Sequence, residues 1–429
     1  MTKNISIPAL ARVEGEGALY IRTKDNKIEH IELNIYEPPR FFEGFLQGRY
    51  FQEVPDITAR ICGICPVAYQ MSSAQALENA YGVKISQEVY DLRRLLYCAE
   101  YIESHVLHMY MLQAPDLLGT DSVIEIAAIA PEVVKKALRS KKLGNALLTA
   151  IGGRSVHPVN TKVGGFYRWP DKEKIKGLIE DFKWGLEFAK ETARWAITLD
   201  FPDFEMEYEY VATSHPDHYA IYNGDVLSST GRKVPVEEYE TRYLESHVPQ
   251  STALHSHTID GNSYFVGPLA RYNLNFEQLR PLALDIAKEI GFKPPQFNPY
   301  KGLLARAVET VEVYDVAIEL MEAYDPQGPP HVKFDLKDGE GYGISEAPRG
   351  LLYHRYKVGK DGLIKEAKIT PPTAQNYAQM EVDLAKLAPE VLFDRSNEEA
   401  SLALEHLLRS YDPCISCSTH FLKLKHERR

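Results

Sequence analysis

ARICGICP at residues 59–66 and DPCISCSTH at residues 412–420 are the most informative stretches of this chain. Each contains a Cys-x-x-Cys pair, Cys62 with Cys65 and Cys414 with Cys417, and the two pairs use four of the five cysteines. About 350 residues separate the pairs, so only tertiary folding can bring them together. Two such pairs meeting in space would surround a soft or borderline metal with four thiolates. The first hypothesis is therefore a metal site that joins the two ends of the chain.

Three other uses of paired cysteines explain the pattern less well. Zinc ribbons usually keep their two Cys-x-x-Cys pairs, here called hooks, within roughly 15–20 residues of each other, because the metal replaces a hydrophobic core that a short segment cannot build. A disulfide framework would leave Cys98 over, and we see no secretory signal. A thioredoxin-like motif would explain only one pair. The spacing alone leaves a catalytic and a structural metal equally open.

The two cysteine motifs resemble the signatures of nickel–iron hydrogenase large subunits. Further family motifs follow in family order along almost the whole chain: ARVEG (11–15), RFFEG (40–44), GGRSVHP (152–158), GGF (164–166), GPLARYN (267–273), RAVE (306–309) and EAPRG (346–350). Any one of these motifs is weak evidence, but their order together with both cysteine pairs is specific. The resemblance implies the catalytic subunit of an enzyme that reversibly cleaves dihydrogen into a proton and a hydride.

The resemblance also implies a role for each paired cysteine. Cys62 and Cys414 would be terminal ligands of nickel, whereas Cys65 and Cys417 would bridge nickel to iron. The iron would carry two cyanides and one carbon monoxide. A non-catalytic four-thiolate zinc protein is the alternative.

Four further residues match family positions near this centre. Glu14 matches the proton-relay glutamate, and we expect its carboxylate within hydrogen-bond reach of Cys417 or one water away. Arg349 matches the arginine over the diatomic ligands of the iron, with Pro348 lining their pocket. Asp412 would pair with Arg349 across the site or cap the turn at residue 413, and we favour a supporting role.

A second metal follows from the same resemblance. Glu43 and His420 match the family's ligands of a buried magnesium or iron, with the backbone carbonyl of Ile369 as the third protein contact. This site would tie the last helix to the N-terminal half. In the family a maturation protease usually cuts after the equivalent of His420, yet FLKLKHERR follows here at residues 421–429. Whether this tail is removed stays open, and we expect it to be exposed or loosely packed.

Composition limits the partners and the location. A net charge of −11 and a pI near 5.8 argue against nucleic acid, because phosphate binding needs a basic surface. No apolar run reaches the ~18 residues of a membrane helix. Free thiols without a secretory signal predict a cytoplasmic protein.

This chain cannot hold an iron–sulfur cluster that would carry electrons away from the metal site. Only Cys98 remains outside the two pairs, and it fits an apolar helical pattern. An iron–sulfur small subunit is therefore required. In its length and in its motif CPVAYQ at residues 65–70, the chain most resembles the cytoplasmic NAD(P)-linked bidirectional hydrogenases of the sulfhydrogenase α-subunit type. That subgroup implies flavin diaphorase and ferredoxin-like subunits, with NADP or NAD as the acceptor.

Two related classes are rivals to this interpretation. The quinone-site subunit of respiratory NADH dehydrogenase would share the fold but lacks the cysteine pairs. A regulatory hydrogen-sensing hydrogenase would keep the cysteine pairs and signal to a kinase. Its sequence motifs should resemble those of the uptake enzymes, which this chain's motifs do not.

Three residues near the cysteines and one glycine-rich stretch carry weaker signals. Ser104 stands where many respiratory relatives carry aspartate. His105 and His108 are expected to line a helix face near the cysteines, and DGEGYG at residues 338–343 is rejected as a nucleotide loop.

The expected fold is mainly α with small β pieces, in a single domain over residues 1–429. Alternating patterns predict hairpins over 17–37 and 353–370. Helical periodicity and end signals predict helices over 66–81, 88–113, about 171–199, about 303–324, and from a capping box at Ser396 to near Ser410. Residues 205–265 read as an irregular excursion with short strands. Cys65 would lie at a helix N-terminus, where amide dipoles favour a thiolate.

Overall fold

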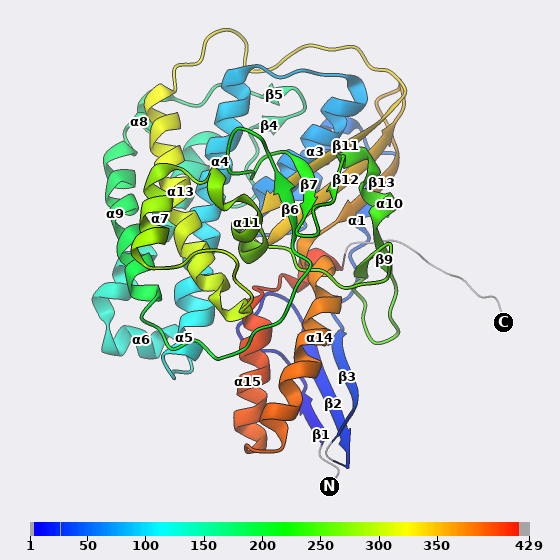
Figure 1. Ribbon diagram of the computed structural model, residues 1–429. Coiled ribbons are helices and arrows are strands. Elements are labelled where there is room, and N and C mark those ends of the chain that lie inside the picture. Colours follow the sequence, from blue (N-terminus) through cyan, green and yellow to red (C-terminus); the bar gives the residue numbers. More distant parts are fainter. Residues whose placement is uncertain (1–3, 26, 420–429) are drawn as a thin grey trace, which may run out of the picture.

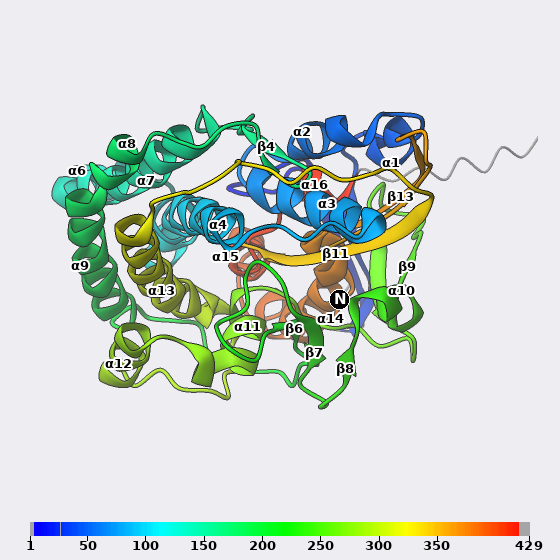
Figure 2. The ribbon, with the colours of Figure 1, turned by 90° about the horizontal axis from the view of Figure 1, so that it is seen from above.

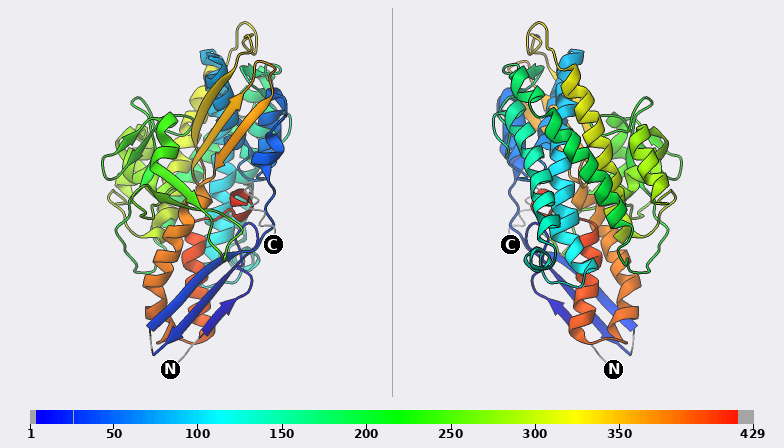
Figure 3. Two further views of the ribbon diagram at one scale, coloured as in Figure 1. Left: turned by 90° about the vertical axis from the view of Figure 1, so that its right-hand side faces the viewer. Right: turned by 90° about the vertical axis from the view of Figure 1, so that its left-hand side faces the viewer.

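The computed structural model describes residues 4–25 and 27–419, and helices dominate this part of the chain (Figure 1). The fold is mainly α with small sheets, as the sequence predicts. Four long helices stand side by side on one side of the molecule (Figure 3): α4 (Gln87–Leu107), α7 (Pro131–Gly152), α9 (Ile179–Ala196) and α13 (Gly302–Ala323). Helix α13 packs against both α4 and α9, and α4 packs against α7. Short helices border this bundle: α5 (Ala114–Leu117), α6 (Val123–Ile129), α8 (Lys172–Lys176) and α12 (Pro281–Glu289).

Three of the predicted helices are present, two of them with a change. The one expected over 88–113 is α4, which changes at its C-terminal end into a π-helical segment, η2 (His108–Gln113). The one expected over about 171–199 is divided at Gly177 into α8 and α9. The one expected over about 303–324 is α13. Helix α7 carries a regular amphipathic pattern that we did not assign.

A second layer is formed by α3 (Pro66–Tyr81) lying on a sheet of β11 (Gly339–Ala347), β12 (Gly350–Val358) and β13 (Ile364–Thr370) (Figure 2). The predicted hairpin over 353–370 is β12 and β13, and β11 is the strand that we missed. Gly341 and Gly343 on β11 face α3, where a Cβ atom would overlap the carbonyl oxygens of Ala76 and Ser72. The glycines of DGEGYG therefore serve close helix–strand packing, which agrees with rejecting a nucleotide loop.

The lower part of the molecule in Figure 1 is an arm in which a three-stranded sheet packs against two helices. The strands are β1 (Asn4–Ile7), β2 (Gly17–Lys24) and β3 (Lys27–Ile35), and the helices are α14 (Pro372–Leu392) and α15 (Asn397–Ser410). Strands β2 and β3 form the predicted hairpin. Ser396 and Glu399 form the predicted capping box at the start of α15.

Small elements complete the fold. The expected excursion over 205–265 contains β6 (Val211–Ser214), β7 (Asp225–Ser228), β8 (Lys233–Val234), η3 (Val236–Glu238), α10 (Tyr239–Arg242), β9 (Tyr243–Ser246) and β10 (His255–Thr258). The others are α1 (Phe42–Leu46), η1 (Phe51–Glu53), α2 (Val54–Ala59), β4 (Thr161–Lys162), β5 (Gly165–Phe166), α11 (Pro268–Asn275), η4 (Phe276–Gln278), η5 (Pro299–Lys301) and α16 (Ile415–Ser418).

The largest hydrophobic core contains both ends of the described chain. It includes residues from Ile5 to Cys417, and all four paired cysteines belong to it. A parallel β-bridge joins Glu14 to Cys414. Among the described helices, none is both long and apolar enough to cross a membrane. The fold thus places the two cysteine pairs in the interior, between the bundle, α3 and the arm.

Candidate metal centre

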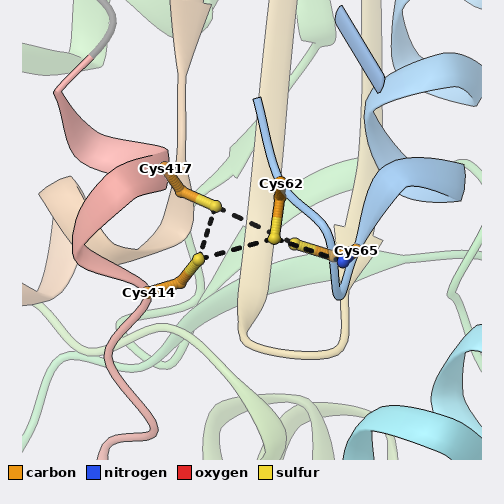
Figure 4. Close-up of side chains that lie close together, drawn as sticks. All are labelled: Cys62, Cys65, Cys414 and Cys417. Carbon is orange, nitrogen blue, oxygen red and sulfur yellow. Dashed lines mark hydrogen bonds between the residues drawn. The ribbon is translucent and has the colours of Figure 1, made fainter. Parts of the chain in front are cut away.

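The four paired cysteines meet at one buried point (Figure 4). Their Sγ atoms all lie within 4.8 Å of one another, and this is the one group of potential metal ligands found among the described residues. Cys62 Sγ lies 3.5 Å from Cys414 Sγ, and Cys65 Sγ lies 3.9 Å from Cys417 Sγ. All four are free thiols. The expected convergence of the two pairs is confirmed.

The electrostatics of this cluster suit a bound cation. Hydrogen bonds from Cys414 and the other thiols lower the pKa of Cys62 well below its usual value, whereas burial raises the pKa of Cys414 well above it. Four thiolates this close repel one another unless a metal shares their charge. Soft sulfur ligands suit nickel, iron or zinc, so the donor set fits a thiophilic metal centre.

The first hook, residues 62–65, is shaped by its own backbone. Pro66 begins α3, so Cys65 stands at the N-cap position, as expected. The amide groups of Ile64 and Cys65 both donate to Cys62 Sγ at 3.3 Å. The carboxylate of Glu100 accepts from the next amides, those of Val67 and Ala68, at 2.6 and 3.2 Å.

The second hook, residues 414–417, is held by side chains from distant segments. The Cys414 amide donates to Thr373 Oγ1 at 3.0 Å, and the Ser416 amide donates to Glu14 Oε2 at 3.1 Å. Arg40 links the two hooks, because its Nη2 donates to the carbonyl oxygens of both Ile61 and Ser416. Sequence reasoning missed Arg40, although it begins the RFFEG motif.

Glu14 lies at the cluster, but beside a different cysteine from the one expected. The Cys414 thiol donates to Glu14 Oε2 at 3.1 Å. The β-bridge to Cys414 aligns Glu14 with the start of the second hook, and the Ile415 amide donates to the Glu14 carbonyl at 2.9 Å. The direct contact of Glu14 is therefore with Cys414. The expected reach to Cys417, directly or through one water, stays a prediction.

A buried ion pair lies beside the cysteines. Arg349 Nη2 is 2.9 Å from Asp412 Oδ1, and Arg349 Nε donates to the Asp412 carbonyl. Arg306 Nη2 lies 3.9 Å from Asp412 Oδ2. Burial opposes the charge of Arg349, but Asp412 and the cysteines raise its pKa above the usual value. The pairing of Asp412 with Arg349 is the first of our two alternatives; Asp412 also has a left-handed φ of 55° at the turn.

The neighbours of this pair are buried and polar. Pro348 is buried, and its carbonyl accepts from Arg271 at 3.0 Å. Ser104 is buried, and its Oγ has no hydrogen-bond partner within the described residues. His105 bonds Glu309 at 2.8 Å and His108 bonds the Arg409 carbonyl at 2.9 Å, so neither ring stands among the metal ligands.

The structure brings together two of the three residues expected at the second metal. The Ile369 amide donates to Glu43 Oε1 at 2.9 Å, on the open edge of β13. Lys368 Nζ lies 3.6 Å from Glu43 Oε1 and also pairs with Glu245. Burial raises the pKa of Glu43. His420 and the tail over 421–429 lie outside the described residues.

Buried, free and converging thiolates define a candidate metalloenzyme centre, and the comparisons with known proteins agree. The profile of the family "Nickel-dependent hydrogenase" matches residues 40–167 and 218–420. Sulfhydrogenase 1 subunit alpha of Pyrococcus furiosus is 33% identical over 424 residues, which cover 98% of each chain. The β-subunit of the NAD-reducing hydrogenase HoxS of Cupriavidus necator is 27% identical, over 98% of this chain and 96% of its own.

A crystal structure of an NAD+-reducing [NiFe]-hydrogenase has the same fold, with a TM-score of 0.89, 24% identity, and coverage of 97% of this chain and 99% of that one. The chain belongs to the nickel-dependent hydrogenases. It is the subunit of that family that carries the nickel–iron site, and the relatives are named as subunits of larger enzymes.

Proposed function

We propose that this chain catalyses reversible cleavage of dihydrogen and passes the electrons through an iron–sulfur small subunit to NADP or NAD. The observation that carries the proposal is the buried cluster of four free thiols from two distant hooks. The NAD-linked part rests on the relatives, because a β-subunit of an NAD-reducing hydrogenase aligns over nearly the whole chain. Two sulfhydrogenase α-subunits align at 33% and 35% identity.

The cysteines would hold nickel through Cys62 and Cys414 and share it with iron through Cys65 and Cys417. When bound, the two metals supply the Lewis-acidic and redox centre at which dihydrogen is polarised and split. Two cyanides and one carbon monoxide on the iron are part of the proposal. Arg349 Nη1 supports them, because this buried donor has no hydrogen-bond partner within the described residues and can serve an anionic ligand.

Glu14 would carry the proton away from Cys414. Its carboxylate lies 3.1 Å from that sulfur and is partly accessible to solvent, so it connects the buried cluster to the outside. Arg349 and Asp412 would stay in place as a charged pair beside the metal centre. The amide of Ser416 fixes the Glu14 carboxylate in the direction of the sulfur.

The second metal, magnesium or iron, would be held by Glu43, the carbonyl of Ile369 and His420. Hard oxygen donors from Glu43 and from the open edge of β13 support magnesium. Lys368 opposes it, since its ammonium group already balances the charge of Glu43. Magnesium content after gel filtration, in the wild type and in Glu43→Gln, tests this site separately from nickel.

The partners follow from the electron path. Within the described chain, only Cys98 lies outside the cluster, so a separate subunit must hold the iron–sulfur clusters. Exposed apolar side chains near the first hook suit its docking: Phe41, Phe45, Tyr50, Val156, Val159 and Tyr167. Phe45 lies on α1, and the others lie in the segments beside α1, η1, β4 and β5; α1, α2 and β4 share one side of the molecule (Figure 2). Flavin diaphorase and ferredoxin-like subunits, a maturation protease and a cytoplasmic location stay predictions.

Metal analysis and hydrogen oxidation by the co-purified complex test the proposal. We expect about one nickel per chain, iron in excess of nickel, and dihydrogen-dependent reduction of both a viologen dye and NADP or NAD. Zinc in place of nickel would overturn the catalytic assignment. Dye reduction without NAD(P) reduction would retain the hydrogenase assignment but overturn the NAD(P)-linked part. That result is the one expected of a hydrogen-sensing subunit.

Glu14→Gln tests the proton route, because glutamine keeps the shape but carries no proton. We expect normal nickel content, loss of most dihydrogen oxidation, and an equal loss of hydrogen–deuterium exchange with solvent. Glu16→Gln is the matched control, since Glu16 is exposed in the same turn and should keep wild-type exchange. Wild-type exchange in nickel-loaded Glu14→Gln would show that the proton leaves by another route.

A further inference from the structure

The start of α3 lacks the cap that its own sequence would normally supply. An N-cap side chain usually accepts a hydrogen bond from the amide of the second or third helical residue. Cys65 occupies this position, and its side chain makes no such bond, because its sulfur points into the cysteine cluster (Figure 4). The amides of Val67 and Ala68 therefore need another acceptor.

Glu100 of α4 supplies that acceptor from a different helix. Its two carboxylate oxygens take the amides of Val67, at 2.6 Å, and Ala68, at 3.2 Å. The side chain is fully buried. Within the described residues no ion pair joins it to a lysine or arginine, and burial raises the pKa of its carboxyl group well above the usual value although the two amides oppose this shift. Glu100 therefore caps α3 from a neighbouring helix.

The amides of the first hook are thereby divided between two acceptors. Those of Ile64 and Cys65 donate to Cys62 Sγ, whereas those of Val67 and Ala68 donate to Glu100. An N-cap side chain is the usual acceptor for the second and third helical amides, so without Glu100 the freed amides would turn to the N-cap sulfur, that of Cys65. Hydrogen bonds to a ligating sulfur withdraw charge from the metal and change its reduction potential.

We propose that Glu100 is a positioning residue that caps α3 from α4 and thereby keeps these amides away from the Cys65 sulfur. Cys65 then remains a strong electron donor, while Cys62 is the sulfur of the first hook that accepts backbone hydrogen bonds. The inference rests on the proposed nickel–iron centre, because it concerns the donor strength of one of its ligands.

The test compares two variants that both remove the carboxyl group. Glu100→Leu removes both acceptor oxygens and fills the space, whereas Glu100→Gln keeps one acceptor oxygen. In the nickel-loaded complex, we expect the midpoint potential of the nickel centre, followed by electron paramagnetic resonance, to move to more positive values. The shift should be larger in Glu100→Leu than in Glu100→Gln, and this difference isolates the hydrogen bonds from the loss of the carboxyl group.

Glu103→Gln is the matched control. Glu103 lies one turn further along α4 and pairs with Lys141 at 2.5 Å, so its replacement leaves the α3 amides capped. It should shift the potential less than Glu100→Leu does. A wild-type potential in nickel-loaded Glu100→Leu, or equal shifts in Glu100→Leu and Glu100→Gln, would overturn the inference. If Glu100→Leu does not fold, an unchanged potential in Glu100→Gln overturns it; absence of nickel from the wild type would instead refute the proposed function.

Discussion

The two cysteine hooks have the same spacing but are built differently. The first continues into α3, a helix of sixteen residues, and is shaped by its own amides and one carboxylate. The second continues into α16, which has four residues, and is held by Glu14, Thr373 and Arg40 from distant parts of the chain. Spacing thus identifies which atoms meet, whereas the means of holding them differs between hooks. The second hook should be the more sensitive to changes far away in sequence.

The largest loss of activity is expected from replacing the cysteines themselves, because both hooks contribute sulfur ligands in the same way. Cys62→Ser and Cys414→Ser should each lose nickel and reduce dihydrogen-dependent dye reduction by more than about 100-fold, beyond the 10–100-fold typical of residues that only support ligands. Cys98→Ala, a buried cysteine outside the cluster, should keep its nickel. Full nickel content in either serine variant would show that the four sulfurs are not ligands of one centre.

Asp412→Asn should damage the second hook most among the supporting changes. Asparagine tolerates the left-handed backbone, but Arg349 and Arg306 lose the carboxylate between them. An uncompensated buried charge costs about 3–5 kcal/mol, which denaturant unfolding would measure. The double variant Arg349→Met with Asp412→Asn should recover part of this loss. If the two single effects simply add, the ion pair is not what stabilises the turn.

A pH-dependent contribution should also belong to the second hook. Tyr411 Oη, beside the hook, donates to Asp383 Oδ2 at 2.6 Å, and burial raises the pKa of Asp383 to about 6. The folded state then keeps the proton that the unfolded state loses near pH 4. The contribution of Asp383 to stability therefore falls as the pH rises from about 4 to about 6, by about 3 kcal/mol, and is constant above.

Asp383→Asn should lack this fall, which urea unfolding at several pH values would measure. Asp56→Asn, an exposed carboxyl on α2 beside the first hook, should follow the wild-type curve. Parallel curves for the wild type and Asp383→Asn would contradict the assignment.

The smallest effect compares one glycine at each hook. Gly15 has a φ of 91°, and a Cβ there would lie 2.5 Å from Glu37 Oε2 and 2.6 Å from Ile415 Cβ. Gly15→Ala should therefore cost at least about 1–2 kcal/mol and lower the nickel content. Gly63→Ala has open space and should stay within about 0.5 kcal/mol of the wild type. Thermal unfolding of both variants measures this, and equal losses would remove the difference between the hooks.

Local signals in the sequence predicted the elements that depend on local chemistry. Pro66 marked the start of α3, and Ser396 with Glu399 marked that of α15. The cysteine pairs were recognisable because few residue types bind soft metals. The strand β11 was missed because its glycines serve contact with α3, which has no local pattern.

The supporting contacts of the site could not be predicted in the same way. Arg40 bonds Ser416, which lies 376 residues further along the chain, and only the fold brings them together. Glu100 could have been suspected as a charged residue on the buried face of a helix. The partner of Glu14 depends on a β-bridge between the ends of the chain. The ligand roles, the second metal with His420 and the single domain over 1–429 stay predictions.

The bridge between Glu14 and Cys414 sets an order of events during synthesis. A ribosome releases the first hook, and the sequence of its long helix, about 350 residues before the second hook exists. Glu14 meanwhile has no Cys414 to contact, and Arg40 reaches only one of its two carbonyl partners. Because N-terminal segments fold first during translation, the nascent chain presents half of a thiolate site that waits for its other half. Metal delivery to all four sulfurs must therefore follow translation of the second hook.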